Sequence, residues 1–174
     1  AWVKAFYSLQ LATADTILSF EDEYAGNAVA MVQQAARTGA ALEVLPMQPA
    51  GVIDVTALEK ALEARSQAGG GGRVGILPTH VQTNSAMVQP AAAVGKLAGT
   101  FGATFLLDAC QSFGQLPVDV RQIGCDFACG TGRKWLRAPR GTGLLYARRG
   151  ALPAGAPGGA PVASLVGEPP AIDH

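Results

Sequence analysis

Short apolar runs alternate along this chain with longer segments in which apolar residues recur every three or four positions. Short runs of this kind are typical of buried strands, and the three-to-four-residue spacing is typical of helices that pack on one face. The predicted strands are residues 16–20, 41–46, 73–77, 104–107, 126–129 and 143–147. The predicted helices are residues 2–11, 27–38, 54–65 and 90–99, with a further short helix capped by Asp119.

This alternation predicts an α/β fold, specifically a three-layer α/β/α sandwich around a mainly parallel sheet. The unit takes in residues 1–149. Residues 150–174 are rich in proline, glycine and alanine without periodicity, so we expect them to form an irregular tail. The glycine run at residues 69–72 is expected to be a loop, because no Gly-Lys-Ser/Thr sequence of a phosphate-binding loop follows it.

Composition and charge narrow the class of partner. The chain has 13 basic and 13 acidic side chains, so its net charge is zero and we expect no nucleic-acid-binding surface. No apolar run reaches the ~18–20 residues that span a bilayer, and the first residues do not resemble a signal peptide. We therefore expect no membrane association and a cytoplasmic location. Hydrophobic residues make up 49% and charged residues 15% of the chain, which suits a buried sheet or part of a larger protein.

The cysteines raise the question of a metal site. Cys125 and Cys129 are four positions apart in a predicted strand, where alternation places both side chains on one face. No further thiolate or imidazole ligand is expected nearby. We therefore interpret these residues and Cys110 as free packing thiols of a reducing compartment rather than zinc ligands, and predict no metal site.

Two polar residues follow predicted strands and carry the candidate chemistry. Asp108 comes directly after residues 104–107, and Lys134 follows residues 126–129 through a glycine-bearing turn. Ligands of an open α/β sheet gather at the carboxyl ends of its strands, so we expect the two side chains to lie together. Alone, Asp108 could cap a turn and Lys134 could be a solvated charge. As a pair they suit pyridoxal 5'-phosphate (PLP), whose aldehyde reacts with a lysine and whose protonated ring nitrogen favours a carboxylate.

Five further residues stand near these strand ends. Gln111 could donate a hydrogen bond to the phenolic oxygen of the cofactor, or simply cap a helix. Thr131 and Arg133 offer a hydroxyl and a cation to its phosphate, although Arg133 also fits a surface ion pair. His80 ends another predicted strand and either lines the pocket or is a satisfied structural histidine. Thr83 follows in the next loop and could approach the ring.

At these residues the chain resembles the class V aminotransferase family of fold-type I PLP enzymes, in particular its cysteine desulfurase and isopenicillin epimerase-like branch. Asp-Ala-Cys-Gln-Ser at 108–112 resembles a family motif with Asp-Ala, one variable residue, and Gln-Ser. The sequence at 130–143 resembles the segment of the Schiff-base lysine, and Thr-His-Val-Gln-Thr-Asn at 79–84 resembles the preceding active-site strand and loop. The resemblance covers residues 1–149.

The resemblance implies a role for each matching residue. Lys134 would form the Schiff base with PLP, while Asp108 would meet the pyridine nitrogen and Gln111 the phenolic oxygen. Thr131 and Arg133 match phosphate-binding positions. The resemblance also implies an amino-acid substrate and a homodimer. The expected activity is that of a lyase, epimerase or transaminase at the α-carbon.

The chain departs from the family pattern at three places. The residue that covers the PLP ring in the family falls on Ala25 here, which leaves Tyr24 as a possible substitute. The upstream phosphate-binding segment and the C-terminal small domain are not in this sequence, and no cysteine follows Cys129 as the desulfurase nucleophile would. We therefore expect the large domain of a fold-type I PLP-dependent transferase, incomplete at both ends. The alternative is a catalytically silent fragment or interaction module that retains the fold.

Overall fold

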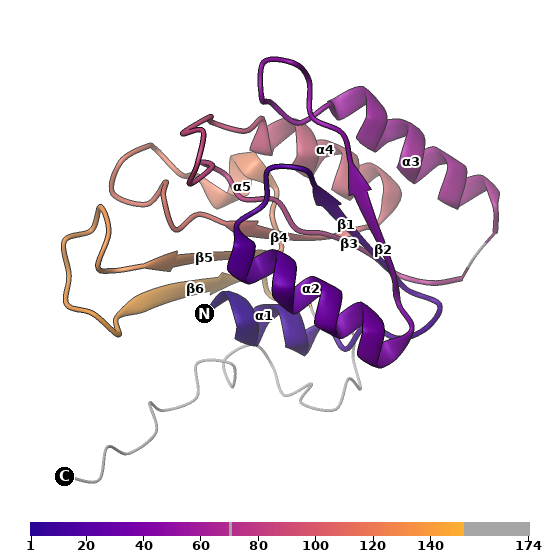
Figure 1. The fold of residues 1–174 in the computed structure, drawn as a ribbon, viewed down its shortest axis with the longest axis horizontal. Coiled ribbons are helices and arrows are strands. Elements are labelled where there is room, and N and C mark those ends of the chain that lie inside the picture. Colours follow the sequence, from indigo (N-terminus) through magenta and orange to yellow (C-terminus); the bar gives the residue numbers. More distant parts are fainter. Residues whose placement is uncertain (70, 152–174) are drawn as a thin grey trace, which may run out of the picture.

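One six-stranded sheet organises the computed structural model, which describes residues 1–69 and 71–151 (Figure 1). The strands lie in the order β2-β1-β3-β4-β5-β6. Their bounds are β1 Thr16–Phe20, β2 Ala41–Leu45, β3 Val74–Ile76, β4 Thr104–Asp108, β5 Phe127–Thr131 and β6 Gly143–Ala147. Strands β1 to β5 run parallel, and β6 pairs with β5 in the antiparallel direction. All six predicted strands form, and the sheet is mainly parallel as expected.

Helices cover both faces of this sheet and complete the three predicted layers. Their bounds are α1 Trp2–Ser8, α2 Ala25–Thr38, α3 Val55–Gln67, α4 Ala91–Phe101 and α5 Val120–Ile123. Figure 1 shows α1 and α2 on one face and α3, α4 and α5 on the other. No helix in the described part of the chain is both long and apolar enough to cross a membrane. Most of the predicted irregular tail, from residue 152 onward, lies outside the described residues.

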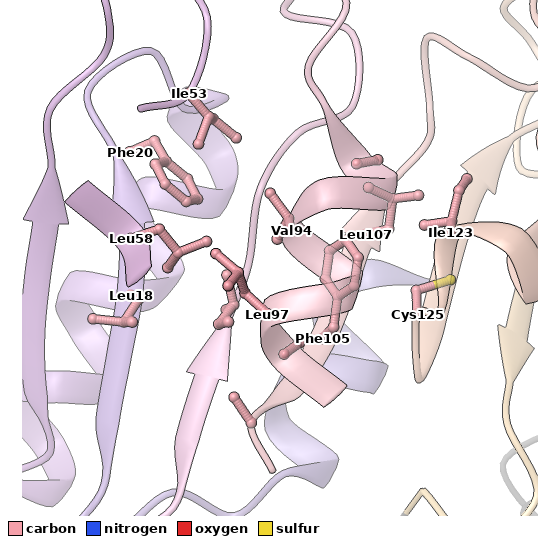
Figure 2. Packing of buried hydrophobic residues seen from close by; sticks show 14 of the residues in the cluster. Leu18, Phe20, Ile53, Leu58, Val94, Leu97, Phe105, Leu107, Ile123 and Cys125 are labelled. Carbon is pink, nitrogen blue, oxygen red and sulfur yellow. The ribbon is translucent and has the colours of Figure 1, made fainter. Parts of the chain in front are cut away.

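The core divides into two clusters because side chains alternate along each strand. On β4, Phe105 and Leu107 face the layer of α3, α4 and α5, and Figure 2 shows them near Val94 and Leu97 of α4. Leu106 belongs to the cluster under α1 and α2. The strand is therefore buried on both faces, as expected of a central parallel strand.

The two cysteines predicted to share one face lie on opposite faces, so that prediction was wrong. Cys125 packs in the cluster of α3, α4 and α5, where Figure 2 labels it, whereas Cys129 packs under α1 and α2. The reason is that β5 begins only at Phe127. Gly124, in the left-handed conformation, ends α5 just before Cys125, so strand alternation does not extend back to that residue.

Asp126 joins three strands at the amino end of β5. Its Oδ2 accepts a hydrogen bond of 2.8 Å from the backbone N–H of Phe105, and its Oδ1 accepts one of 2.8 Å from Arg148 Nε. We expect Asp126→Ala to lower the free energy of unfolding by about 2 kcal/mol, because it leaves the buried N–H of Phe105 without an acceptor. Urea denaturation of the full-length protein measures the change. Asp126→Asn keeps an acceptor for Phe105 and should cost clearly less; equal losses in both variants would contradict this explanation.

Candidate functional site

A small cavity of about 80 Å³ lies at the carboxyl ends of β4 and β5. Six of the seven predicted site residues line it: Thr83, Asp108, Gln111, Thr131, Arg133 and Lys134. Tyr24, Thr79 and Cys110 complete the lining. Residues from distant parts of the sequence meet here because the carboxyl ends of parallel strands share one edge of the sheet.

Asp108 forms the buried floor of this cavity and is only 5% exposed. Its Oδ1 accepts a hydrogen bond of 2.9 Å from the backbone N–H of Cys110, and its Oδ2 accepts one of 2.8 Å from Asn27 Nδ2. Both donors are neutral. None of the ion pairs found within residues 1–69 and 71–151 involves Asp108. A buried carboxylate held only by neutral donors is well suited to accept a cationic ligand group.

Asn27 and Glu23 support Asp108 from the start of α2, and sequence reasoning missed both. The Nδ2 group of Asn27 also donates to Glu23 Oε1 at 3.0 Å, so one amide bridges the two carboxyl groups. Glu23 further accepts hydrogen bonds from the hydroxyl of Thr79 and, at 3.1 Å, from its backbone N–H. Asn27 shares the buried face of α2 with Ala30, Met31 and Gln34, so a polar residue on an apolar face was the available signal.

Burial raises the pKa of Glu23 to about 7, and the nearby charge of Asp108 acts in the same direction. An acid with a raised pKa in the folded state stabilises the fold most at low pH, and this stabilisation is lost as pH rises through the folded pKa. We expect the unfolding free energy of wild type, relative to Glu23→Gln, to fall by about 3 kcal/mol between pH 4.5 and pH 8. Urea denaturation of both proteins across this range measures it. A constant difference would contradict the raised pKa.

The turn after β5 places Lys134 and Arg133 at the cavity. Gly132 is packed so closely that a Cβ atom there would lie 2.2 Å from Thr142 Oγ1. Its backbone N–H donates to the carbonyl of Thr142 at 2.9 Å, and its carbonyl accepts from Ala138 N at 2.8 Å. These contacts fix the turn. Lys134 is half-buried and Arg133 is exposed.

A larger groove adjoins the cavity and shares Thr83 and Gln111 with it. This groove has a volume of about 460 Å³, and its other wall includes Val81, Val88 and Trp135. The Oε1 atom of Gln111 accepts a hydrogen bond of 3.0 Å from Trp135 Nε1. This contact turns the Gln111 amide so that its NH₂ end is the one left for a ligand.

Two sequence expectations concern residues at the margins of this cavity. Tyr24 lines it, and its ring lies over Gly26, where a Cβ atom would be 2.7 Å from Tyr24 Cε1. His80 does not line it. His80 is buried beside a separate cavity with Gln89 and Asp119, and its Nδ1 has no hydrogen-bond partner in the described part of the chain. Burial lowers the pKa of His80, which favours the neutral ring.

Comparisons with known proteins agree with this fold. The family model "Aminotransferase class-V" matches residues 2–165. A probable cysteine desulfurase of Halalkalibacterium halodurans is 31% identical over 142 residues, which are 82% of this chain and 33% of the relative. A cysteine desulfurase of Klebsiella pneumoniae strain 342 is 34% identical over 154 residues, covering 87% of this chain and 36% of the relative.

Solved structures of PLP-dependent enzymes have a similar fold. The apo structure of a cysteine desulfurase from Thermococcus onnurineus NA1 superposes with a TM-score of 0.73 at 25% identity, covering 84% of this chain and 36% of that one. An alanine–glyoxylate aminotransferase from Nostoc sp. gives a TM-score of 0.70 at 25% identity, covering 86% of this chain and 38% of that one.

The fold is that of the large domain of fold-type I PLP-dependent transferases. The chain belongs to the class V aminotransferase family, as its motifs at 108–112 and 130–143 led us to expect. It spans about a third of the length of the curated relatives that it matches.

Proposed function

We propose that the protein carrying this chain is a PLP-dependent enzyme that acts at the α-carbon of an amino acid as a lyase, epimerase or transaminase. The observation that carries the proposal is the buried carboxylate of Asp108, which has neutral hydrogen-bond donors only and shares one cavity with Lys134. A protonated pyridine nitrogen fits such a carboxylate, and the ε-amino group of Lys134 fits the cofactor aldehyde. When bound, PLP supplies an electron sink for bonds at the α-carbon.

Residues in and beside the cavity would then each have their own role in binding the cofactor or in catalysis. Asn27 and the backbone N–H of Cys110 hold the Asp108 carboxylate in place. Lys134 would hold the cofactor through Nζ and would move a proton at the α-carbon. Gln111 would donate from its amide to the phenolic oxygen. These roles rest on the geometry of the cavity together with the family resemblance.

Four further residues complete the proposed site. Thr131 and Arg133 would contribute a hydroxyl and a cation to the phosphate, and the ring of Tyr24 would cover the cofactor. Thr83 lies where the cavity meets the larger groove and so approaches the ring or its substituents. His80, in its separate cavity, has no direct contact with the cofactor in this proposal.

Self-association is a further part of the proposal. Trp135 and Leu136 are 50% and 43% exposed, although both are large apolar residues beside Lys134. Large apolar side chains at such a position are typical of protein–protein interfaces. We therefore propose a homodimer for the full-length protein. A monomer in size-exclusion chromatography with full activity would contradict it. A cytoplasmic location stays a prediction from composition.

Titration of the full-length protein with PLP tests the cofactor assignment. We expect a visible absorbance band of lysine-linked PLP, and borohydride reduction followed by peptide mass mapping should place the cofactor on Lys134. Lys96, on the exposed side of α4, is the internal control and should remain unmodified. No band in the full-length protein would favour the alternative, a silent module that retains the fold.

A further inference from the structure

Two thiols and one carboxylate converge where the cavity meets the core: Asp108 and Cys110 line the cavity, and Cys129 is buried beneath them. A carboxylate oxygen of Asp108 and the Sγ atoms of Cys110 and Cys129 all lie within 4.8 Å of one another. The sheet enforces this grouping. Asp108 and Cys129 are register partners on β4 and β5, and the backbone N–H of Ala109 donates to the carbonyl of Cys129 at 2.8 Å, which holds Cys110 beside Cys129.

The chemistry and spacing of these groups match a soft divalent ion. Zinc and cadmium favour thiolate ligands, and carboxylate oxygen is a common additional ligand. A tetrahedral zinc ion with bonds of about 2.0–2.3 Å requires ligand atoms roughly 3.3–3.8 Å apart. Groups already within 4.8 Å reach that spacing by small side-chain rotations. Asn27, which donates to Asp108 Oδ2, would orient the carboxylate as an outer partner.

We propose that Asp108, Cys110 and Cys129 form a binding site for a thiophilic divalent cation, Zn²⁺ or Cd²⁺. Asp108 and Cys110 line the open cavity, so the ion enters from that side and its fourth position is available to water. Nothing in the family resemblance or in the matches to known proteins assigns this site.

Charge balance is consistent with the site. Both thiols lose their protons to solvent when the ion binds, so two thiolates, one carboxylate and a divalent cation carry one net negative charge. Lys134 and Arg133 line the same cavity and offset that charge. The Cys129 thiol does not ionise readily alone, because its hydrogen bond to Cys110 and its burial raise its pKa. A hard cation such as Mg²⁺ prefers oxygen ligands, so this set of two thiols and one carboxylate suits it poorly.

Occupancy by the ion and by PLP should exclude each other, since both engage Asp108. This consequence, unlike the metal site itself, rests on the proposed function. Metal binding to the cofactor-free protein therefore tests the metal site. Metal binding to the PLP-saturated protein tests whether the ion and PLP exclude each other.

Cadmium titration of the reduced, cofactor-free, full-length protein tests the site through the ultraviolet cadmium–thiolate absorbance. We expect one Cd²⁺ to bind with this band, and Cys110→Ser to weaken its affinity at least about 100-fold. Cys125→Ser is the control: Cys125 is also a free thiol but packs on the face of the sheet opposite Cys129. No cadmium–thiolate band in wild type, or equal affinities in Cys110→Ser and Cys125→Ser, would overturn the proposal.

Two controls keep the result interpretable. Cys129→Ser places a hydroxyl among apolar side chains, so its circular dichroism is compared with wild type, and Cys110→Ser, at a half-buried position, is the primary variant. PLP saturation should reduce cadmium affinity at least about 10-fold. An unchanged affinity overturns mutual exclusion alone, whereas absence of PLP binding overturns the proposed function and leaves the metal site standing.

Discussion

Lys134→Ala is expected to lower the turnover of an amino-acid substrate by about 1,000-fold or more and to abolish covalent attachment of PLP. The side chain would perform two tasks, holding the cofactor and moving the α-proton, and loss of a general acid–base group alone costs 10²–10⁴-fold. The turn that carries Lys134 is fixed by backbone contacts of Gly132, so removal of the side chain should leave the fold intact. Exchange of the substrate α-hydrogen in deuterated buffer measures the loss.

Lys96→Ala is the matched control for this result. Lys96 lies on the exposed side of α4, remote from the cavity, and its removal should change neither the absorbance band nor α-hydrogen exchange. A Lys134→Ala protein that still carries PLP covalently after borohydride reduction would assign the linkage to another lysine. Unchanged exchange in that variant would remove Lys134 from the chemistry.

Gly95→Ala should lower the free energy of unfolding by about 3 kcal/mol. Gly95 lies inside α4 where the helix packs on the end of α5, and a Cβ atom there would be 1.7 Å from the carbonyl oxygen of Ile123. Such an overlap with backbone cannot be relieved by a rotamer change, so α4 and α5 must move apart. The resulting loss outweighs the 0.5–1 kcal/mol by which alanine, compared with glycine, normally stabilises a helix. Urea denaturation measures the change.

Gly99→Ala provides the opposite outcome in the same helix. Gly99 is exposed, and nothing lies within 4 Å of a Cβ atom built there. Alanine should therefore raise the unfolding free energy by about 0.5–1 kcal/mol through helix propensity alone. If both variants shifted stability in the same direction, packing against Ile123 would not be the reason for glycine at position 95.

The fold was predictable because strands that are buried on both faces of the sheet contain recognisable apolar runs. Strands such as β1 and β4 contain short apolar stretches, and the segments between them carry helical spacing, so layers and strand bounds follow with errors of a few residues. The largest error at a terminus concerns the helix expected at 2–11, which ends at Ser8. The antiparallel direction of β6 does not follow from its apolar pattern, since that pattern is the same in either direction.

The candidate site was only partly predictable. Asp108 and Lys134 could be found because each follows a buried strand. Asn27 could have been noticed as a polar residue on an apolar helix face, but its contact with Asp108 could not be predicted. That contact joins residues 81 positions apart and depends on the angle at which α2 meets the sheet. The grouping of Cys110 with Cys129 was missed for a similar reason. It depends on the register between β4 and β5, whereas sequence spacing pointed to Cys125.

The different sequence separations within the site have a consequence for how it assembles. Lys134 lies between β5 and β6, which pair as neighbours in the chain, so its turn needs only a short loop to close. The Asn27–Asp108 contact closes a far longer loop, which contains β2, β3 and β4, and long loops carry a larger entropic cost. During folding, the turn that carries Lys134 should therefore form before the contact between Asn27 and Asp108. Local opening at the start of α2 would release Asp108 from Asn27 while leaving the lysine turn in place.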